Sequence, residues 1–217
     1  MTALGGDLLV FEGPDQVGKT SVSRATAAAL AAVGVSVEWR SFPGATPSSL
    51  GELVYRVHHD PHSVGVGSVS PLALQCLHVA AHLDAIEQDI GPLILNGTTI
   101  VLDRYWWSTW VYGRAAGVPE DVLHLLVSAE RAQWGDIVPK RVFLLSRSGN
   151  PAQSPRLSVL YSELAHKWAA HAPVEHIPND GPLEEAVSRV MQSCGHKWPR
   201  ARSGGRESGP AAQRQTS

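Results

Sequence analysis

Cysteine is scarce in this chain, since Cys76 and Cys194 are the only two among 217 residues. Two cysteines can build neither a disulfide framework nor a four-cysteine zinc site, so we expect a reducing, cytoplasmic environment. Long apolar runs are also absent. The longest candidate, residues 93–102, is interrupted by Asn96 and Gly97 and is shorter than the ~20 residues that a membrane helix needs. The first residues lack the basic segment of a secretion signal, so neither export nor a membrane span is predicted.

The chain also lacks a large net charge of either sign. The formal net charge is −2, whereas nucleic-acid-binding proteins typically carry a basic surface, so we expect no nucleic-acid partner. Only the end of the chain departs from an ordinary composition. Residues 198–217 hold four arginines against one glutamate, with three glycines and two prolines, and we predict a disordered tail there. No repeat or linker interrupts residues 1–197, which are predicted to form one domain.

Strand-like and helix-like segments alternate along residues 1–197. The predicted strands are short apolar runs at residues 8–12, 35–40, 98–102, 141–146 and 174–177. The predicted helices cover residues 20–33, 50–57, 70–90, 107–116, 120–134, 157–168 and 183–194. The third helix is expected to end before Gly91-Pro92. Because strands separated by helices are joined by right-handed crossovers, this order predicts an α/β fold, with a five-stranded parallel sheet covered by helices on both faces.

A phosphate-binding motif follows the first predicted strand. Glycines in such a loop let backbone N–H groups surround phosphate oxygens, and the N-terminus of the following helix adds positive charge. Lys19 is expected to bridge the β- and γ-phosphates of ATP, and the Thr20 hydroxyl to ligate Mg²⁺. The pattern G-x-x-x-x-G-K-S/T is matched by Gly13, Pro14, Asp15, Gln16, Val17, Gly18, Lys19 and Thr20. The predicted ATP site consists of these residues and the following Ser21.

Four segments resemble the thymidylate kinase family. Residues 11–21, FEGPDQVGKTS, resemble its phosphate-binding loop, whose pattern is FEGxDxxGKT. Three further segments follow in the family's order: SFPG with LGE at residues 41–52, the long helix of residues 74–90, and DRYWWS at residues 103–108, followed by Tyr112. The resemblance covers roughly residues 7–195. It is specific because the loop and the DRY segment occur together.

The resemblance implies a three-layer P-loop NTPase fold and an ATP- and Mg²⁺-dependent kinase. Its partners would be nucleotides, with a deoxynucleoside 5′-monophosphate as acceptor and dTMP as the first candidate, and a homodimer would form through helices. Asp103, at the end of the third strand, would orient Mg²⁺ or the attacking oxygen, while Arg104 would grip the acceptor phosphate. Asp15 would contact the acceptor's 3′-hydroxyl. The other implied acceptor contacts are Phe42, His78, His82, Ser108, Thr109 and Tyr112, the last leaving little room for a 2′-hydroxyl.

The acceptor helix departs from the family pattern. His78 and His82 stand where the family places a base-stacking phenylalanine and an arginine that contacts the pyrimidine edge. A neutral imidazole stacks and makes a single hydrogen bond, but it does not copy a fixed guanidinium, so the base stays open. The i, i+4 spacing also occurs in metal sites, although no glutamate stands beside the first histidine. A second group, His58, His59 and His62, is interpreted as part of a solvated loop.

The lid over the phosphates departs too. Gln16 stands where many family members carry an arginine, and the predicted lid, residues 147–156, is short. Arg147 and Arg156 are the only cations near enough in sequence to stabilise the transferring phosphoryl group. Two alternatives therefore stay open. One is a kinase that accepts a modified deoxynucleotide or a nucleoside, and the other is a catalytically weak nucleotide-sensing module.

Overall fold

The structure is a computed structural model that describes residues 5–44, 46–149 and 154–196. The tail predicted at residues 198–217 lies outside the described residues. Five strands form a single parallel sheet in the order β2-β3-β1-β4-β5. The strands are β1 (Leu8–Glu12), β2 (Val37–Ser41), β3 (Thr99–Asp103), β4 (Arg141–Ser146) and β5 (Val174–Pro178). The predicted five-stranded parallel sheet is confirmed.

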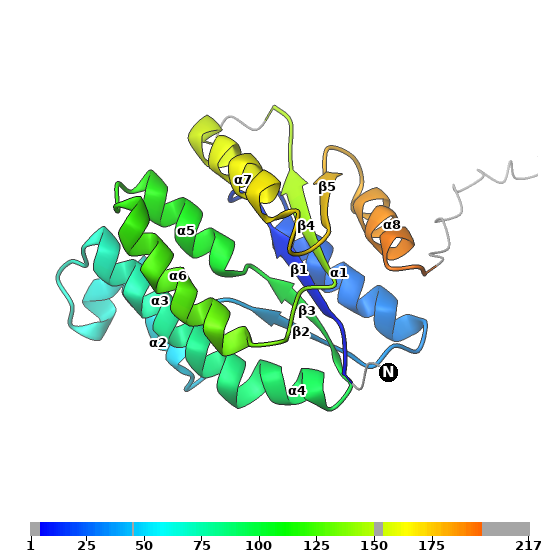
Figure 1. Cartoon of the computed structure of the whole chain (residues 1–217), viewed down its shortest axis with the longest axis horizontal. Coiled ribbons are helices and arrows are strands. Elements are labelled where there is room, and N and C mark those ends of the chain that lie inside the picture. The colour runs from blue at the N-terminus through cyan, green and yellow to red at the C-terminus, as the bar shows by residue number, and fades with distance from the viewer. Residues whose placement is uncertain (1–4, 45, 150–153, 197–217) are drawn as a thin grey trace, which may run out of the picture.

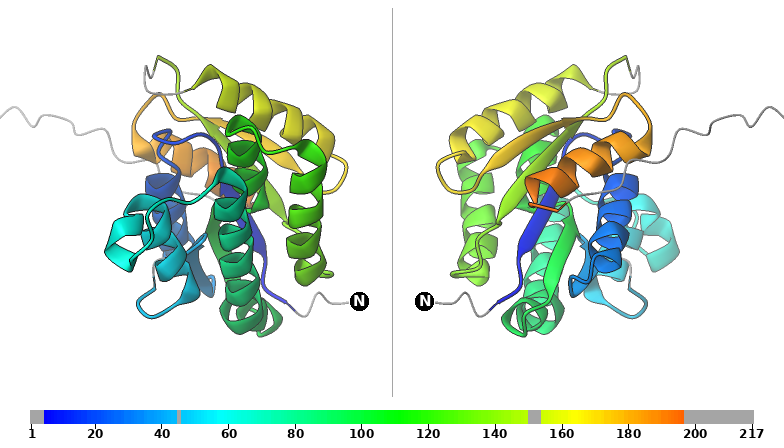
Figure 2. Two further views of the ribbon diagram at one scale, coloured as in Figure 1. Left: turned by 90° about the vertical axis from the view of Figure 1, so that its left-hand side faces the viewer. Right: turned by 90° about the vertical axis from the view of Figure 1, so that its right-hand side faces the viewer.

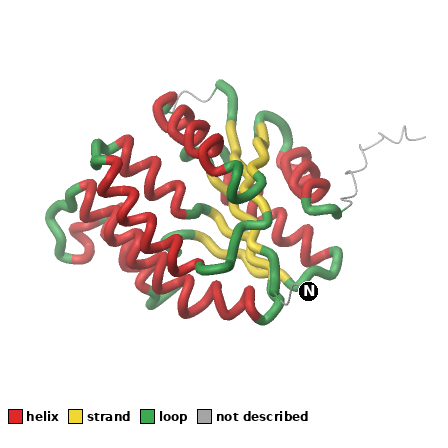
Figure 3. Tube along the Cα trace, in the orientation of Figure 1, coloured by secondary structure: helices red, strands yellow, loops and turns green. Residues whose placement is uncertain are grey.

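Helices cover both faces of this sheet (Figures 1 and 2). On one face lie α1 (Lys19–Ala32) and α8 (Leu183–Ser193). The other face carries the larger layer, formed by α3 (Pro71–Ala85), α4 (Gly91–Leu95), α5 (Trp106–Ala115), α6 (Glu120–Trp134) and α7 (Pro155–Trp168). The remaining helix, α2 (Leu50–His59), packs against α3 and is followed by a short 3₁₀ turn at Pro61–Val64. The strands are thus enclosed between two helical layers (Figure 3).

The long third helix does not end where the sequence pattern predicted. After α3 the chain makes a π-helical turn over Ile86–Ile90 and continues as α4 to Leu95. The Gly91 N–H bonds to the Ile86 carbonyl, and a Cβ at Gly91 would lie only 2.8 Å from that oxygen. The wide turn therefore needs glycine at this position. Pro92 falls in the first turn of α4, where its missing N–H costs least.

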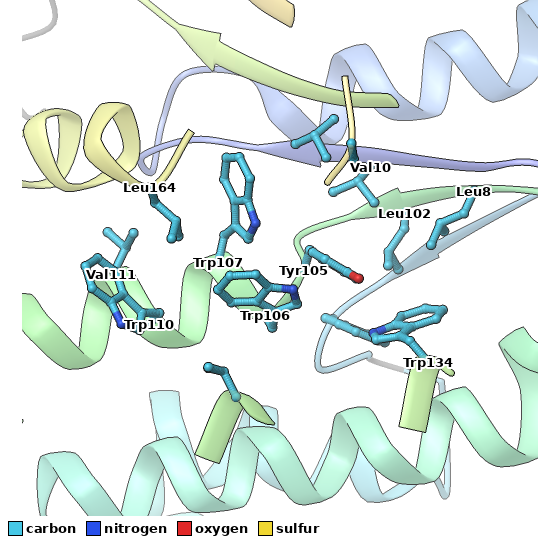
Figure 4. Packing of buried hydrophobic residues seen from close by; sticks show 14 of the residues in the cluster. Leu8, Val10, Leu102, Tyr105, Trp106, Trp107, Trp110, Val111, Trp134 and Leu164 are labelled. Carbon is cyan, nitrogen blue, oxygen red and sulfur yellow. The ribbon is translucent and has the colours of Figure 1, made fainter. Parts of the chain in front are cut away.

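Tryptophan fills the core between the sheet and the larger helical layer. Trp106, Trp107 and Trp110 of α5 are 3%, 0% and 2% exposed. Their rings lie between the sheet residues Val10 and Leu102 and the neighbouring helices (Figure 4). The indoles therefore pack the core. Among the described helices, none is both long and apolar enough to cross a membrane.

Truncation of the most deeply buried indole should be costly. Trp107→Ala is expected to lower the free energy of unfolding by about 3–5 kcal/mol, because it leaves a cavity that a close-packed core cannot fill. Leu125→Ala on α6 is the control, since Leu125 is 75% exposed and should change stability by less than about 0.5 kcal/mol. Urea denaturation measures both. Equal losses in the two variants would contradict this account of the core.

Candidate active site

The loop between β1 and α1 is shaped by two glycines with positive φ. Gly13 (φ 139°) passes so close to the backbone of Leu145 that a Cβ there would clash, and Gly18 (φ 87°) lies against the Asn179 amide. Asn179 in turn donates a hydrogen bond of 2.8 Å to the Val17 carbonyl. The loop is therefore clamped between the ends of β4 and β5.

Lys19 is folded back over this loop. It is 5% exposed, and its ammonium group donates to the Pro14 carbonyl at 2.6 Å. The Asp15 carboxylate lies 4.0 Å from the same ammonium group. Burial first, and then the positive charge of Arg104, lower the pKa of Lys19 to about 8. An anionic phosphate oxygen near this nitrogen would therefore be strongly favoured, because it would restore the lost solvation.

Asp103 and Thr20 meet at the carboxyl end of β3. The Thr20 hydroxyl donates to Asp103 Oδ2 at 2.5 Å. Asp103 is 4% exposed, and its Oδ1 is buried without a hydrogen-bond partner in the described part of the chain. Mg²⁺ commonly takes one or two protein oxygens and completes its shell with phosphates and water. The carboxylate and hydroxyl pair fits such an ion. No group of three or more His, Cys, Asp or Glu residues suited to a metal occurs within the described ranges.

Arg104 directs its guanidinium group into the space beside the loop. Its backbone has φ 75°, a left-handed conformation that non-glycine residues seldom adopt. The guanidinium donates to Asp15 and, at 3.2 Å, to the Ser108 hydroxyl. Its central carbon lies 5.6 Å from the centre of the Tyr112 ring. Burial raises the pKa of Asp15, but the charge of Arg104, hydrogen bonds to the carboxylate and the charge of Lys19 together outweigh it, and the pKa lies below its usual value. The structure thus assembles four of the predicted acceptor residues.

A buried carboxylate missed by the sequence analysis holds this arrangement. Glu12, the last residue of β1, is 0% exposed. Its Oε1 accepts the backbone N–H groups of Tyr105 and Ser108 at 2.7 and 3.0 Å. Its Oε2 accepts the Ser108 and Tyr161 hydroxyls at 2.8 and 3.2 Å. Burial raises the pKa of Glu12, while the hydrogen bond from Ser108 and the charge of Arg104 oppose that rise. The only signal in the sequence was an acidic residue at the end of an apolar strand.

Two of the histidines lie on the Arg104 side of the site. His78 Nε2 of α3 and His58 Nδ1 of α2 are 3.2 Å apart. The charge of Arg104 acts on both rings. The interpretation of His58 and His59 as a solvated loop is wrong, because both residues belong to α2 and their rings stack at 4.7 Å.

His82 and Phe42 lie deeper. Each is 3% exposed, and their rings stack with centres 4.0 Å apart. His82 Nδ1 is hydrogen-bonded to the buried Glu130 at 2.8 Å. These two residues thus form the layer behind His78, and their contact with a base stays a prediction. Thr109 is also buried, at 3%.

The two predicted lid arginines are held by carbonyl groups. Arg147 donates to the Asn179 carbonyl at 2.9 Å, and Arg156 donates to the Arg114 carbonyl at 3.2 Å. Asp180 accepts the Ser148 N–H at 2.6 Å, which fixes the start of the lid to the end of β5. Arg147 is therefore linked through Asn179 to the phosphate-binding loop, whereas Arg156 lies beside α5. Residues 150–153 of the predicted lid lie outside the described residues.

A cavity of about 500 Å³ is found elsewhere, between α6 and α7. Its aromatic wall is formed by Tyr105, Trp134 and Trp168. Neither the phosphate-binding loop nor Arg104 lines it. The candidate active site is therefore identified by its charges and strand ends, and not by this cavity.

Comparison with known proteins agrees with this geometry. The family model described as thymidylate kinase matches residues 11–153. A thymidylate kinase from Nostoc punctiforme is 30% identical over 209 residues, covering 87% of this chain and 95% of the relative. The chain belongs to the thymidylate kinase family. Another member, from Chlorobium chlorochromatii, is 28% identical over 166 residues, covering 76% of this chain and 70% of the relative.

The fold of the family is shared as well. A crystal structure of thymidylate kinase from Ehrlichia chaffeensis superposes with a TM-score of 0.73 at 19% identity, covering 88% of this chain and 99% of that one. The predicted P-loop fold is therefore confirmed, and so is the prediction of a nucleotide-binding phosphotransferase. The modest identity is that of a divergent member of the thymidylate kinase family.

Removal of the buried Glu12 carboxylate should lower the stability of the fold around the site. Glu12→Ala leaves two backbone N–H groups and two hydroxyls without their acceptor, and we expect a loss of about 3 kcal/mol or more in the free energy of unfolding. Glu12→Gln retains an acceptor oxygen and is expected to lose about 1 kcal/mol. Urea denaturation of both variants measures the difference. If the alanine variant were as stable as the glutamine variant, Glu12 would not anchor α5.

Proposed function

We propose that the chain is an ATP- and Mg²⁺-dependent kinase that transfers the γ-phosphoryl group to a deoxynucleoside 5′-monophosphate, with dTMP as the first acceptor to test. The relatives named thymidylate kinase support this proposal. The observation that carries it is the pairing of two anion-binding groups at the ends of adjacent strands. The ammonium of Lys19 follows β1, and the guanidinium of Arg104 follows β3. Two phosphate-bearing substrates would meet end to end between them.

The donor side is formed by Gly13–Ser21. The loop amides and Lys19 would hold the phosphates of ATP, with Lys19 moving from the Pro14 carbonyl to a phosphate oxygen. Thr20 and Asp103 would hold Mg²⁺, which supplies charge neutralisation of the β- and γ-phosphates when bound. The unpartnered Oδ1 of Asp103 is available for this purpose, either directly or through water.

The acceptor side is centred on Arg104. Its guanidinium group is oriented by Asp15 and Ser108 and presents a rigid fork suited to a phosphate dianion. Asp15 separates the charges of Lys19 and Arg104, and its second oxygen is assigned to the acceptor's 3′-hydroxyl. The Tyr112 ring beside Arg104 would lie against the sugar and disfavour a 2′-hydroxyl. No side-chain base is needed, because a phosphate monoester with a second pKa of about 6 is already ionised at neutral pH.

The remaining charge would come from Arg147 and Arg156. Both are held by neutral carbonyl groups and no carboxylate pairs with them among the described residues, so their charge remains available to the transferring phosphoryl group. Phosphoryl transfer depends mainly on such positioning and neutralisation. A cytoplasmic location and a homodimer paired through helices stay predictions, as does the single domain of residues 1–197.

The proposed function is tested by ADP release with ATP, Mg²⁺ and a panel of nucleoside and deoxynucleoside monophosphates. We expect turnover with dTMP, and we expect Lys19→Ala to lower kcat by about 10²–10³-fold because a charged contact with the transferring group is lost. Lys140→Ala is the matched control, since Lys140 pairs with Asp7 near the opposite end of the strands and should leave kcat unchanged. ATP binding without turnover of any acceptor would contradict the kinase and favour the sensing module.

The role assigned to Arg104 is tested by a change that keeps its charge. Arg104→Lys loses the bidentate fork, so we expect kcat/KM for dTMP to fall by about 100-fold while KM for ATP stays within twofold. Arg141→Lys is the control, because Arg141 pairs with Glu175 at the start of β4. Steady-state kinetics with each substrate varied in turn separate the two sides. An equal loss of kcat/KM for ATP and for dTMP would contradict the assignment of Arg104 to the acceptor side of the site.

A further inference from the structure

Two imidazoles on the acceptor side share one hydrogen bond. His78 Nε2 and His58 Nδ1 lie 3.2 Å apart, and the rings meet edge to face with centres 5.1 Å apart. They come from the packed helices α3 and α2, so the contact is part of the fold. Such a bond needs one N–H and one bare nitrogen. Two neutral rings carry two protons in all, and one of these lies in the shared hydrogen bond.

The surroundings keep both rings neutral. Burial lowers the pKa of His78 to about 3, and the neighbouring His82, His58, Arg104 and His59 act in the same direction. Burial, then His59 and Arg104, also lower the pKa of His58, and the smaller effect of Asp15 opposes them. Because both pKa values lie below the usual value for histidine, the neutral form of each ring is favoured at pH 8.

A neutral pair has one free donor and one free acceptor, and these lie at the two ends of the pair, at His78 Nδ1 and His58 Nε2. When His78 Nε2 holds the shared proton, His78 Nδ1 is bare and the second proton sits on His58 Nε2. When His58 Nδ1 holds it instead, His78 Nδ1 carries an N–H and His58 Nε2 is bare. The two arrangements differ only in the order of donor and acceptor. A fixed arginine, which only donates, has no such freedom.

The pair lies where an acceptor base would be expected. The His78 ring centre lies 6.2 Å from that of His82, which stacks on Phe42, and the Phe42 N–H donates to the carbonyl of Asp103. The charge of Arg104, the next residue, acts on both rings of the pair, and that of Asp15 acts on His58. These are the two side chains assigned above to the acceptor's phosphate and sugar. Behind His78, His82 has its Nδ1 engaged by Glu130 and is 3% exposed. The exposed His58 and the partly exposed His78 are therefore better placed than His82 to meet a ligand.

On the basis of the proposed function, we infer that His78 Nδ1 reads position 4 of the acceptor base while His58 gives or takes the shared proton at His78 Nε2, and that the site takes 4-oxo and 4-amino pyrimidine nucleotides alike. A 4-oxo pyrimidine presents an acceptor at position 4 and a donor at N3, and a 4-amino pyrimidine presents the reverse. By a change of tautomer, His78 Nδ1 donates to the 4-oxo group or accepts from the 4-amino group. Position 4 then keeps a hydrogen-bond partner in either substrate, whereas an unpaired polar group is what normally makes a polar site reject the wrong substrate.

The matched substrates dUMP and dCMP test this inference, because they differ only in this edge. With saturating ATP at pH 8, we expect kcat/KM for the two to agree within about tenfold, whereas a site with fixed donors rejects the mismatched base by about 10⁴-fold. A ratio above 100 in either direction, with turnover of dTMP or dUMP intact, overturns the inference and leaves the proposed function standing. Absence of turnover with dTMP, dUMP and dCMP overturns both.

Two variants of nearly identical shape test the mechanism. In His58→Asn the side-chain amide donates or accepts near the position of Nδ1, so the dCMP to dUMP ratio should stay within threefold of the parent. In His58→Asp the carboxylate only accepts, which forces the shared proton onto His78 Nε2 and leaves Nδ1 bare. The dCMP to dUMP ratio of kcat/KM should then rise about tenfold, as one hydrogen-bond preference of about 1.4 kcal/mol implies.

The ratio removes effects common to both substrates, such as repulsion between the new carboxylate and the acceptor phosphate. His58 is exposed at the end of α2, so both variants should keep the parent's melting temperature within a few degrees. Equal ratios in the two variants would show that the histidine contact is only structural and would overturn the inference.

Discussion

The four hydrogen bonds accepted by the Glu12 carboxylate join β1 to the start of α5 and to α7. After Glu12 the chain enters the phosphate-binding loop, and its partners Tyr105 and Ser108 follow closely after Arg104. A carboxylate also lies favourably at the N-terminus of a helix, where backbone N–H groups have no partner within the helix. The spacing between the two proposed anion sites therefore depends on the Glu12 carboxylate, although no contact with either substrate is assigned to it.

The cations of the site are restrained without being neutralised. Lys19, Arg147 and Arg156 each donate to a backbone carbonyl. Asp15 is the acidic residue nearest to both Lys19 and Arg104, and the low pKa produced by Arg104 keeps it ionised. Asp15 therefore lies between the two groups that are proposed to bind phosphates. On the base side the neutral histidines add no charge, so recognition there would depend on hydrogen bonds.

Prediction from the sequence succeeded where the signal was local. The phosphate-binding loop is eight consecutive residues between an apolar strand and a helix, and the sheet was predicted from five short apolar runs. The break expected at Gly91-Pro92 was wrong, because a π-helical turn with an unhindered Gly91 carries the helix past the proline. Glu12 was missed because its partners lie 93 to 149 residues away in the chain. His58 was misinterpreted because its partner, His78, belongs to a different helix.

By itself, the sequence determined the class of fold, the phosphate-binding loop and the identity of the charged residues that follow strands β1 and β3. These depend on short-range patterns, since alternating apolar runs and a glycine-rich turn before a helix have the same meaning in any context. Only the tertiary structure decided which polar groups are buried and which nitrogen of each histidine is engaged. Those properties depend on contacts between helices far apart in the chain, and residue type alone does not specify where a side chain finds its partner.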